Sequence, residues 1–409
     1  MASTNDHPNS PPRVPRQTDI SPTRRWVVMV AMALGSFAIG TTEFVSMGLL
    51  PMIAGDFGIT ESQAGHVISA YALGVVIGAP LITALTGSIP RRRILLALML
   101  VFTFAHLLAL FADNYWTLMA ARFIAGLPHG AYFSIAGLSA ASLSPPGQRG
   151  RAVAFIGLGL SVATVIGVPA AQAMGQALGW VSAYVLVAGI GLTTFLLLFF
   201  LMPHMVNMKP TGVRTELGAL KRPQVWLTLA LGTVGFGGMF AVYTYITWTM
   251  TERAGMDESW IWIVLMAYGI GNVLGNLLGG RLADRNLDRG ILFSLIMILI
   301  VLVAFYFTSL DPVLGTINFL LIGLFGASIT PSLQVRLMDV AGDAQTLAAS
   351  LNHSALNLAN AVGAAIGGAV IAAGFNFAAP AIAGAGLALL AIALWVPTAA
   401  LRRREVQGA

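Results

Sequence analysis

Long apolar runs dominate the pattern of this sequence. After about residue 25, apolar stretches of roughly 20 residues alternate with short polar segments almost to the C-terminus. An α-helix needs about 20 apolar residues to cross the hydrocarbon core of a bilayer, and its backbone must be hydrogen-bonded within the segment. The pattern therefore predicts membrane-spanning helices. The expected spans are 26–50, 63–86, 94–112, 117–141, 152–176, 182–202, 225–251, 259–281, 290–309, 313–335, 346–373 and 378–401.

Composition agrees with a lipid environment and excludes several kinds of chemistry. Of 409 residues, 57% are hydrophobic and 9% are charged, whereas about a quarter of a soluble chain is charged. Cysteine is absent, which excludes disulfides, thiolate metal sites and cysteine nucleophiles. The sequence also contains no HExxH, phosphate-loop or GxSxG motif and no dense cluster of histidines and acids. We therefore expect no enzymatic activity, catalytic residue, metal or cofactor.

The basic residues predict the orientation of the helices. All but two of the 22 lysines and arginines fall in segments on one side of the predicted membrane; the exceptions are Arg122, within a helix, and Arg253, on the other side. By the positive-inside rule, both termini are expected to be cytoplasmic, in a multi-pass protein of the cell inner membrane. Because the basic residues lie at helix ends and not on one face, the net charge of +6 does not predict nucleic-acid binding.

The predicted spans divide into two groups of six. A proline-containing polar segment, 203–224, separates a bundle at 26–202 from a bundle at 225–401. Residues 1–25 are proline-rich and polar and predict a disordered cytoplasmic tail, and 402–409 predict a second cytoplasmic tail. A constant offset of 197 residues relates two motifs, one in the second span and one in the eighth: Ala70, Tyr71, Gly74 and Gly78 recur as Ala267, Tyr268, Gly271 and Gly275. Duplicated halves are typical of transporters that hold substrate between them.

Several motifs fit one family. The segment Gly280–Arg285, with Asp284 and then Arg289, resembles the Gly-x-x-x-Asp-Arg signature of the major facilitator superfamily, although the equivalent loop of the first half has Gly87 and Ser88 in place of the Asp and Arg. Arg122 with Gly126 and Gly130 is similar to the proton-antiporter motif of the twelve-helix drug-export branch. Gly159, Gly167, Pro169 and Gly175 resemble the glycine- and proline-rich antiporter motif.

The first span extends this resemblance. The runs Gly40–Phe44 and Gly48–Pro51 are similar to the first helix of the arabinose-efflux and chloramphenicol-resistance permeases. The resemblance covers residues 26–401 and implies an all-α membrane protein: twelve transmembrane helices in two pseudo-symmetric six-helix bundles, the major facilitator fold. Members of this branch handle sugars, nucleosides and drugs, so the resemblance does not identify the substrate.

Two sets of residues are candidates for gating. Asp284 with Arg285 and Arg289, next to Gly280, would form a charge latch whose bonds break when the transporter opens; a simple topology anchor is the alternative. Gly167 and Pro169 mark close packing where the two halves would rock, and static packing explains them equally well.

Charges inside the membrane are the candidates for proton coupling. Glu43 is the one acid well inside a predicted span, and Arg122 lies at a similar depth, so each is a candidate partner for the other. Burial disfavours a charged Glu43 whereas Arg122 favours it, so a motion that separates them would promote protonation. A static buried pair is the alternative. His129 shares the helical face of Arg122 and could relay a proton or make a packed hydrogen bond, while His106 is interpreted as a filler of the core or the lipid interface.

Aromatic and amide residues are the candidates for substrate binding. Phe236, Phe240 and Tyr243 form a one-sided stripe, which suits an amphiphilic or aromatic solute or else ordinary packing. Asn272, Asn276, His353 and Asn357 would add polar contacts, with Asn352 and Asn360 as further polar positions on the same span as His353; interhelical hydrogen bonding is the alternative for these side chains.

Together these features predict a secondary active transporter that exports small molecules in exchange for protons by alternating access. A proton-coupled symporter that imports a sugar or metabolite is the alternative, and a membrane enzyme or channel fits less well. The expected partners are a small-molecule substrate, protons and the lipid bilayer, and the expected state is a monomer.

Overall fold

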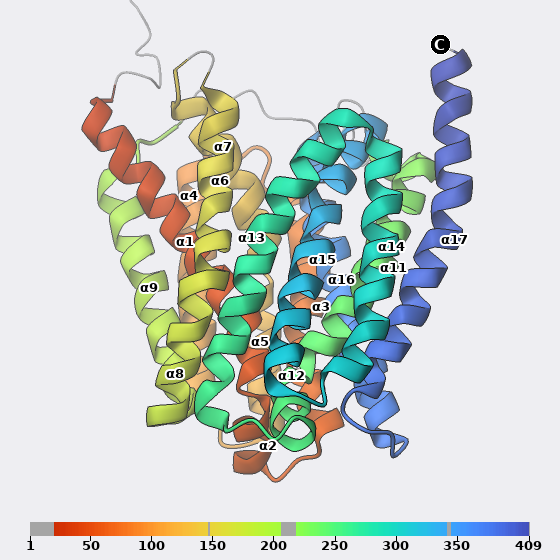
Figure 1. Ribbon diagram of the computed structural model, residues 1–409. Coiled ribbons are helices and arrows are strands. Elements are labelled where there is room, and N and C mark those ends of the chain that lie inside the picture. The colour runs from red at the N-terminus through yellow and green to blue at the C-terminus, as the bar shows by residue number, and fades with distance from the viewer. Residues whose placement is uncertain (1–19, 146–147, 206–217, 342–344, 409) are drawn as a thin grey trace, which may run out of the picture.

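The first half of the chain is a bundle of helices. The computed structural model describes residues 20–145, 148–205, 218–341 and 345–408, and all regular structure in these ranges is helical (Figure 1). Residues 1–19 and 206–217, which hold most of the predicted tail and linker, lie outside the described ranges. The elements of the first half are α1 (Pro22–Gly48), α2 (Leu50–Phe57), α3 (Glu61–Leu85), α4 (Arg91–Leu110), α5 (Tyr115–Gly126), α6 (His129–Leu143), α7 (Arg149–Val162), the π-helical turn η1 (Ala163–Gly167), α8 (Val168–Leu178) and α9 (Trp180–Leu201).

The second half has the same succession of long helices. After the short turn η2 (Ala219–Lys221), its elements are α11 (Pro223–Thr244), α12 (Ile246–Trp248), the π-helical turn η3 (Thr249–Arg253), the 3₁₀ turn η4 (Glu258–Trp260), α13 (Ile261–Arg285), α14 (Leu287–Thr308), α15 (Pro312–Ala341), α16 (Gln345–Ala372) and α17 (Ala379–Gly408). Several helices are longer than expected. Helix α1 begins at Pro22, α15 continues to Ala341, and α17 continues through the segment predicted as a C-terminal tail.

One predicted span is built from two helices. Within the described residues, 11 helical runs are long and apolar enough to cross a membrane. The remaining crossing consists of α5 and α6, which are separated at Leu127 and Pro128, where proline cannot donate a backbone hydrogen bond. Tyr115 at the start of α5 donates to the Gln63 carbonyl oxygen at 3.0 Å, and Arg91 at the start of α4 donates to the Leu138 carbonyl oxygen of α6 at 2.8 Å. The pair therefore spans the full height of the bundle, and the prediction of twelve crossings is confirmed.

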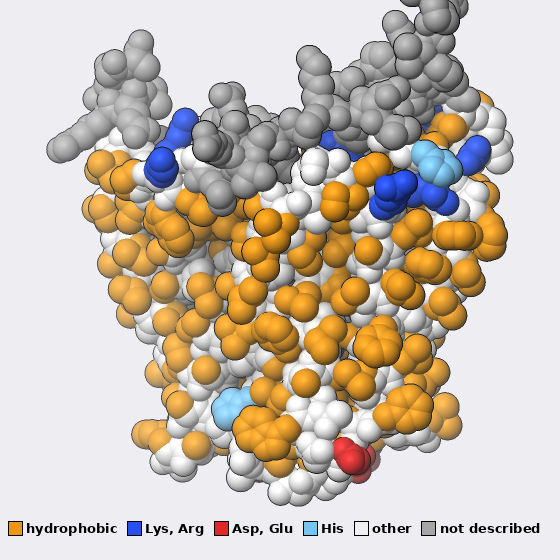
Figure 2. Space-filling view, turned by 180° about the vertical axis from the view of Figure 1, so that it is seen from behind, with side chains coloured by type: hydrophobic (Ala, Val, Ile, Leu, Met, Phe, Trp, Pro, Cys, Tyr) orange, Lys and Arg blue, Asp and Glu red, His pale blue; other side chains and the backbone are white. Residues whose placement is uncertain are grey.

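The molecule has two distinct faces. We call the face where α1 begins and α17 ends the terminal face, and the other the opposite face (Figure 1). Figure 2 shows a broad belt of hydrophobic side chains between them, with basic side chains gathered towards the terminal face and an acidic side chain at the opposite face. Such a belt, with charges beyond its edges, is the surface that a bilayer requires.

The internal repeat has the same packing role in both halves. A Cβ atom added at Gly74 or Gly78 of α3 would collide with the carbonyl oxygens of Phe123 and Leu127. At the matching positions of α13, Gly271 and Gly275 pack in the same way on the carbonyl oxygens of Leu320 and Leu324 of α15. The glycines therefore let α3 approach α5 and let α13 approach α15 at backbone contact distance.

The predicted position of Arg336, outside the membrane spans, is wrong. It was expected in a polar segment after the tenth span, but it is fully buried within α15. Its Nη1 lies 2.9 Å from Asp288 Oδ1 at the start of α14, and its Nη2 donates to the Thr398 carbonyl oxygen of α17 at 2.6 Å. The longer α15 carries Arg336 into this position, where charge-assisted bonds join three helices of the second half.

The two halves meet closely towards the opposite face. Thr247 Oγ1 of α12 donates to the Gly48 carbonyl oxygen of α1 at 3.0 Å. Gly269 of α13 packs so tightly on the Thr164 carbonyl of η1 that a Cβ atom would collide with it. These contacts join the two halves towards the opposite face, whereas nearer the terminal face α3 and α16 join them through the Thr83 hydroxyl, which donates to Ser350 Oγ at 3.2 Å.

Candidate functional site

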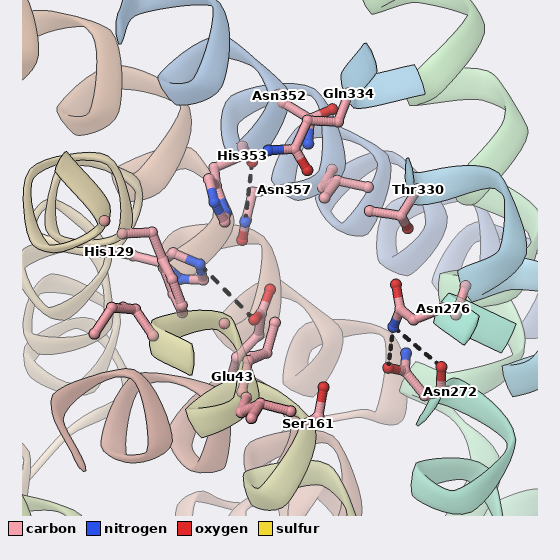
Figure 3. Close-up of a pocket in the computed structure, with 18 of the residues that line it drawn as sticks. Glu43, His129, Ser161, Asn272, Asn276, Thr330, Gln334, Asn352, His353 and Asn357 are labelled. Carbon is pink, nitrogen blue, oxygen red and sulfur yellow. Dashed lines mark hydrogen bonds and ion pairs between the residues drawn. The ribbon is translucent and has the colours of Figure 1, made fainter. Parts of the chain in front are cut away.

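A cavity of about 570 Å³ lies between the two halves (Figure 3). The first half contributes α1, α6 and α7 to its wall, and the second half contributes α11, α13, α15 and α16. From Glu43 its lining continues to Leu138 and Met338, which lie near the terminal-face ends of α6 and α15. The cavity therefore extends from the region where the halves are in contact towards the terminal face.

Glu43 and His129 lie next to each other at this cavity. His129 Nε2 lies 3.9 Å from Glu43 Oε2, and the two side chains point towards each other in Figure 3. His129 is the first residue of α6, directly after the break at Pro128, and its Nδ1 lies 3.0 Å from the Tyr71 hydroxyl. Only 6% of Glu43 and 1% of His129 are exposed. A carboxylate, an imidazole and a phenol thus form a continuous chain of titratable groups inside the membrane.

Arg122 makes no direct ion pair with Glu43 in this conformation. Its Nη1 instead donates to Thr42 Oγ1 at 3.0 Å, and its guanidinium lies over the ring of Tyr71 at 4.4 Å and near that of Tyr184 at 5.5 Å. Among the described residues, its Nε and Nη2 atoms have no hydrogen-bond partner. Cation–π contact with Tyr71 therefore places Arg122 behind the Glu43–His129 pair, and not in it.

His106 holds this arrangement in place. Its interpretation as a mere filler of the core or the lipid interface is therefore corrected. Its Nδ1 lies 2.8 Å from the Phe102 carbonyl oxygen, so this nitrogen carries the proton, and its Nε2 accepts from Thr42 at 2.8 Å. Thr42 Oγ1 can then accept from Arg122. The sequence offered only a weak signal for this role, a lone histidine in an apolar run.

Most of the predicted substrate residues line the cavity together. Phe236, Phe240, Asn272, Asn276, His353 and Asn357 all do so. Tyr243 is buried but does not line the cavity, because it packs behind the wall on Phe44 at 5.4 Å and on Tyr268 at 4.5 Å between ring centroids. Lining residues that the sequence did not single out for binding include Phe44, Ser134, Ser161, Tyr268, Thr330 and Gln334.

His353 brings the second half next to the titratable chain. Its ring stacks on Phe133 of α6 with centroids 4.8 Å apart and lies 5.6 Å from the ring of His129. Asn352 and Asn357 line the cavity beside it, whereas Asn360, on the same helix, does not. A movement of one half relative to the other would therefore alter the surroundings of His129 directly.

Gly167 and Pro169 lie at an irregular turn of the fifth crossing. The π-helical turn η1 ends at Gly167, and the amide of Val168 donates to the Ala163 carbonyl oxygen. Pro169 has no amide hydrogen, which favours such a widened turn. A Cβ atom at Gly167 would collide with Thr41 and Phe37 of α1, so the glycine is required for close packing. Their predicted gating role stays a prediction.

The predicted charge latch is not closed in this conformation. Asp284, Arg285 and Arg289 are exposed at the terminal face, and no ion pair within 4.0 Å joins them in the described part of the chain. A Cβ atom added at Gly280 would meet no atom of another described element within 4 Å, so this glycine is not required for close packing here. The latch would therefore have to form in another state of the transport cycle.

We expect Asp284→Asn to slow transport by about tenfold, the effect of losing one charge-assisted hydrogen bond in a second state. Substrate binding in detergent should stay unchanged because Asp284 does not line the cavity. The two quantities are measured as initial flux in vesicles and as equilibrium binding to purified protein. Asp113→Asn, on the opposite face, is the control; equal loss of flux and binding in Asp284→Asn would contradict a gating role.

Comparison with known proteins agrees with this architecture. The family model described as Major Facilitator Superfamily matches residues 32–322 and 246–408. The chain is 39% identical to the inner membrane transport protein YdhP of Escherichia coli K12, over 89% of this chain and 94% of that protein. It is 30% identical to the putative transporter AraJ of the same organism, over 86% of this chain and 89% of that protein. It is 36% identical to a chloramphenicol resistance protein of Streptomyces lividans, over 59% and 62%.

A solved structure has the same fold. A bacterial homologue of the human lysosomal transporter Spinster, in an inward-facing and unoccupied conformation, superposes with a TM-score of 0.72 at 15% identity, covering 93% of this chain and 98% of that one. The family match and the named transport proteins confirm that the chain is a transporter and not an enzyme, and these relatives agree with the predicted resemblance to the arabinose-efflux and chloramphenicol-resistance permeases. The chain therefore belongs to the Major Facilitator Superfamily and is a secondary membrane transporter that works by alternating access.

Proposed function

We propose that this transporter exports a small molecule across the inner membrane in exchange for protons, with its terminal face in the cytoplasm. The observation that carries the proposal is the Glu43–His129 contact at 3.9 Å in a cavity shared by both halves. Glu43 is the one carboxylate among the described residues that line this cavity. The basic side chains at the terminal face support the proposed orientation.

Coupling follows from the location of this carboxylate. An ionised carboxylate in the membrane costs several kcal/mol unless it is paired or hydrated. In the present arrangement His129 offers a partner, and Arg122 adds positive charge nearby. Rocking of the two halves would change both the hydration of Glu43 and the position of His353 beside His129, so proton binding and the conformation of the transporter would depend on each other.

One proton is energetically sufficient for modest export. Moving one charge through 100 mV supplies about 2.3 kcal/mol, which supports roughly a 50-fold gradient of a neutral solute. The similarity to a chloramphenicol resistance protein supports export as the direction. A symporter that imports its substrate uses the same fold and the same energy source, and remains the second candidate.

Transport in inverted membrane vesicles tests this proposal. The interior of the vesicles is made acidic, and chloramphenicol or another neutral aromatic solute is added to the external medium. Accumulation of the solute inside the vesicles is measured together with the internal pH. Export by antiport requires accumulation that a protonophore abolishes and substrate-induced alkalinisation of the vesicle interior. Gradient-driven loss of substrate from preloaded inverted vesicles, with acid leaving alongside it, would instead identify import by symport.

A further inference from the structure

Helices α4 and α9 lie side by side at the surface of the first half (Figure 1). A Cβ atom added at Gly191 of α9 would lie 2.8 Å from Thr103 Oγ1 of α4, so the two helices are in close contact. They run in opposite directions, so the first residues of α4 and the last residues of α9 are both at the terminal face. The side chains at this end do not line the transport cavity.

Arg92, at the start of α4, holds the end of α9. Its Nη2 donates to the Phe199 carbonyl oxygen, and its Nη1 donates to Nε2 of His204 at 3.3 Å. A guanidinium can only donate, so His204 accepts at Nε2 and carries its proton at Nδ1. His204 is exposed, and its Nδ1 makes no hydrogen bond within the described part of the chain. An N–H donor is therefore available there to a ligand.

Arg93 provides further donors at the same end of α4. It is exposed, and its side chain takes part in no hydrogen bond or ion pair with any other described residue. Figure 2 shows basic side chains beside a histidine at the terminal-face edge of the hydrophobic belt. Capping of α9 uses Arg92, so Arg93 is free to bind a molecule from outside the protein.

An apolar surface continues from these cations into the membrane. Leu100 and Phe104 follow Arg93 on one face of α4, at i+7 and i+11, and both are exposed. On α9, Phe199 is also exposed, and its ring centroid lies 5.6 Å from the guanidinium carbon of Arg92. A molecule with an anionic head and apolar chains would match both parts of this surface.

The distribution of acids determines which headgroup fits. The described residues of the first half include no acid at the terminal face, because the four acids of this half line the cavity or lie at the opposite face: Glu43, Asp56, Glu61 and Asp113. The terminal face of the second half, by contrast, carries Asp284 and Asp288. An ammonium headgroup would therefore find no carboxylate partner beside Arg93, whereas a phosphate would find cations only.

We propose that the terminal-face ends of α4 and α9 bind an anionic phospholipid whose headgroup carries no ammonium, such as phosphatidylglycerol. Arg93 and the Nδ1 of His204 donate to its phosphate, while Arg92 adds positive charge and orients the imidazole. The acyl chains lie along Leu100, Phe104 and Phe199. This site is separate from the cavity and does not depend on the proposed function or on the direction of transport.

Native mass spectrometry of the purified full-length protein in detergent tests the proposal. The probes are dioleoyl phosphatidylglycerol, dioleoyl phosphatidylcholine and glycerol 3-phosphate, which has the phosphate but no acyl chain. We expect the first phosphatidylglycerol to bind at least about tenfold more tightly than phosphatidylcholine. Glycerol 3-phosphate should not bind at the same concentrations, because it cannot contact the apolar surface.

Variants then assign this preference to the corner of α4 and α9. Arg93→Gln should weaken phosphatidylglycerol binding about fivefold, the effect of one arginine near an anionic lipid, and leave phosphatidylcholine binding unchanged. Arg93→Lys, which keeps the charge, should retain most of the affinity. Arg281→Gln is the matched control, because Arg281 is exposed at the terminal face of the second half and the substitution removes the same charge. Lipid-free melting curves establish that each variant is folded.

The proposal is wrong if the unmodified protein binds the two phospholipids equally, or if Arg93→Gln keeps the full preference for phosphatidylglycerol. An equal loss in Arg281→Gln would show a general effect of surface charge and no site at α4 and α9. Binding of glycerol 3-phosphate as tight as that of the lipid would identify a site for free phosphate compounds instead.

Discussion

Glu43→Gln is expected to abolish proton-driven accumulation in inverted vesicles, lowering its rate at least about 100-fold, the range that follows when the group carrying the proton is lost. Glutamine keeps the shape and a hydrogen-bonding oxygen but cannot take up a proton. Among the described residues, no second carboxylate lines the cavity to replace it. Substrate binding should survive and should lose the pH dependence that comes from protonation of Glu43, because the glutamine side chain does not titrate.

Glu252→Gln is the matched control for this substitution, since Glu252 is exposed at the opposite face, in η3. It should transport at the rate of the unmodified protein. If Glu43→Gln still drives pH-dependent accumulation at the normal rate, Glu43 is a structural residue and the proton travels by another route. His129, which connects Glu43 to Tyr71, would be the next residue to replace.

Gly269→Val is expected to reduce transport by about 10- to 100-fold, because overpacking of this kind costs about 1–3 kcal/mol or more. The added side chain would collide with the Thr164 carbonyl in η1 and push α13 of the second half away from the fifth crossing of the first half. The protein should still insert into the membrane, since Gly269 packs across the two halves and not within one of them.

The conformational effect can be measured directly because the chain contains no cysteine. A cysteine at Ser161, which lines the cavity, reports accessibility to a membrane-impermeant maleimide from each side. In the Gly269→Val background we expect faster labelling from the opposite face. Gly189→Val is the control, because a Cβ atom there has no atom within 4 Å; normal transport by Gly269→Val would show that this contact is not part of the cycle.

The sequence predicted how deep the charged residues lie in the membrane, but it did not predict which side chains they contact. The positions of Glu43 and Arg122 along their helices place both charges inside the membrane, and this could be read from the sequence. The rotation of each helix decides which neighbour a side chain meets. Here Arg122 is held by its cation–π contact with Tyr71 and by the Thr42 hydroxyl, which His106 holds in turn. His129, and not Arg122, therefore lies within 4.0 Å of Glu43.

For the residues predicted to bind substrate, the sequence likewise determined the helix positions, whereas the packing of the helices determined which side chains line the cavity. The spacing of Phe236 and Phe240 placed them correctly on one face of α11, but Tyr243 lies at the end of this helix, where it packs on Phe44 and Tyr268 and does not line the cavity. The i, i+4 spacing of Asn272 and Asn276 is visible in the sequence, whereas the direction of the Asn276 amide depends on a bond to the Asn272 carbonyl. Arg336 was misplaced because the end of α15 extends beyond its apolar run.

The sequence by itself determined the all-helical membrane fold, the twelve crossings and the repeated glycines, because a bilayer imposes a minimum apolar length on each segment separately. It also placed most residues of the cavity on the correct helices. Only the tertiary structure decided that His129 lies next to Glu43, that Arg122 stacks on Tyr71, and that the amide nitrogens of Asn276 and Asn357 bond to backbone carbonyl oxygens of their own helices. These relations depend on how helices rotate and pack against partners that are distant in the chain, and a local apolar pattern carries no information about that packing.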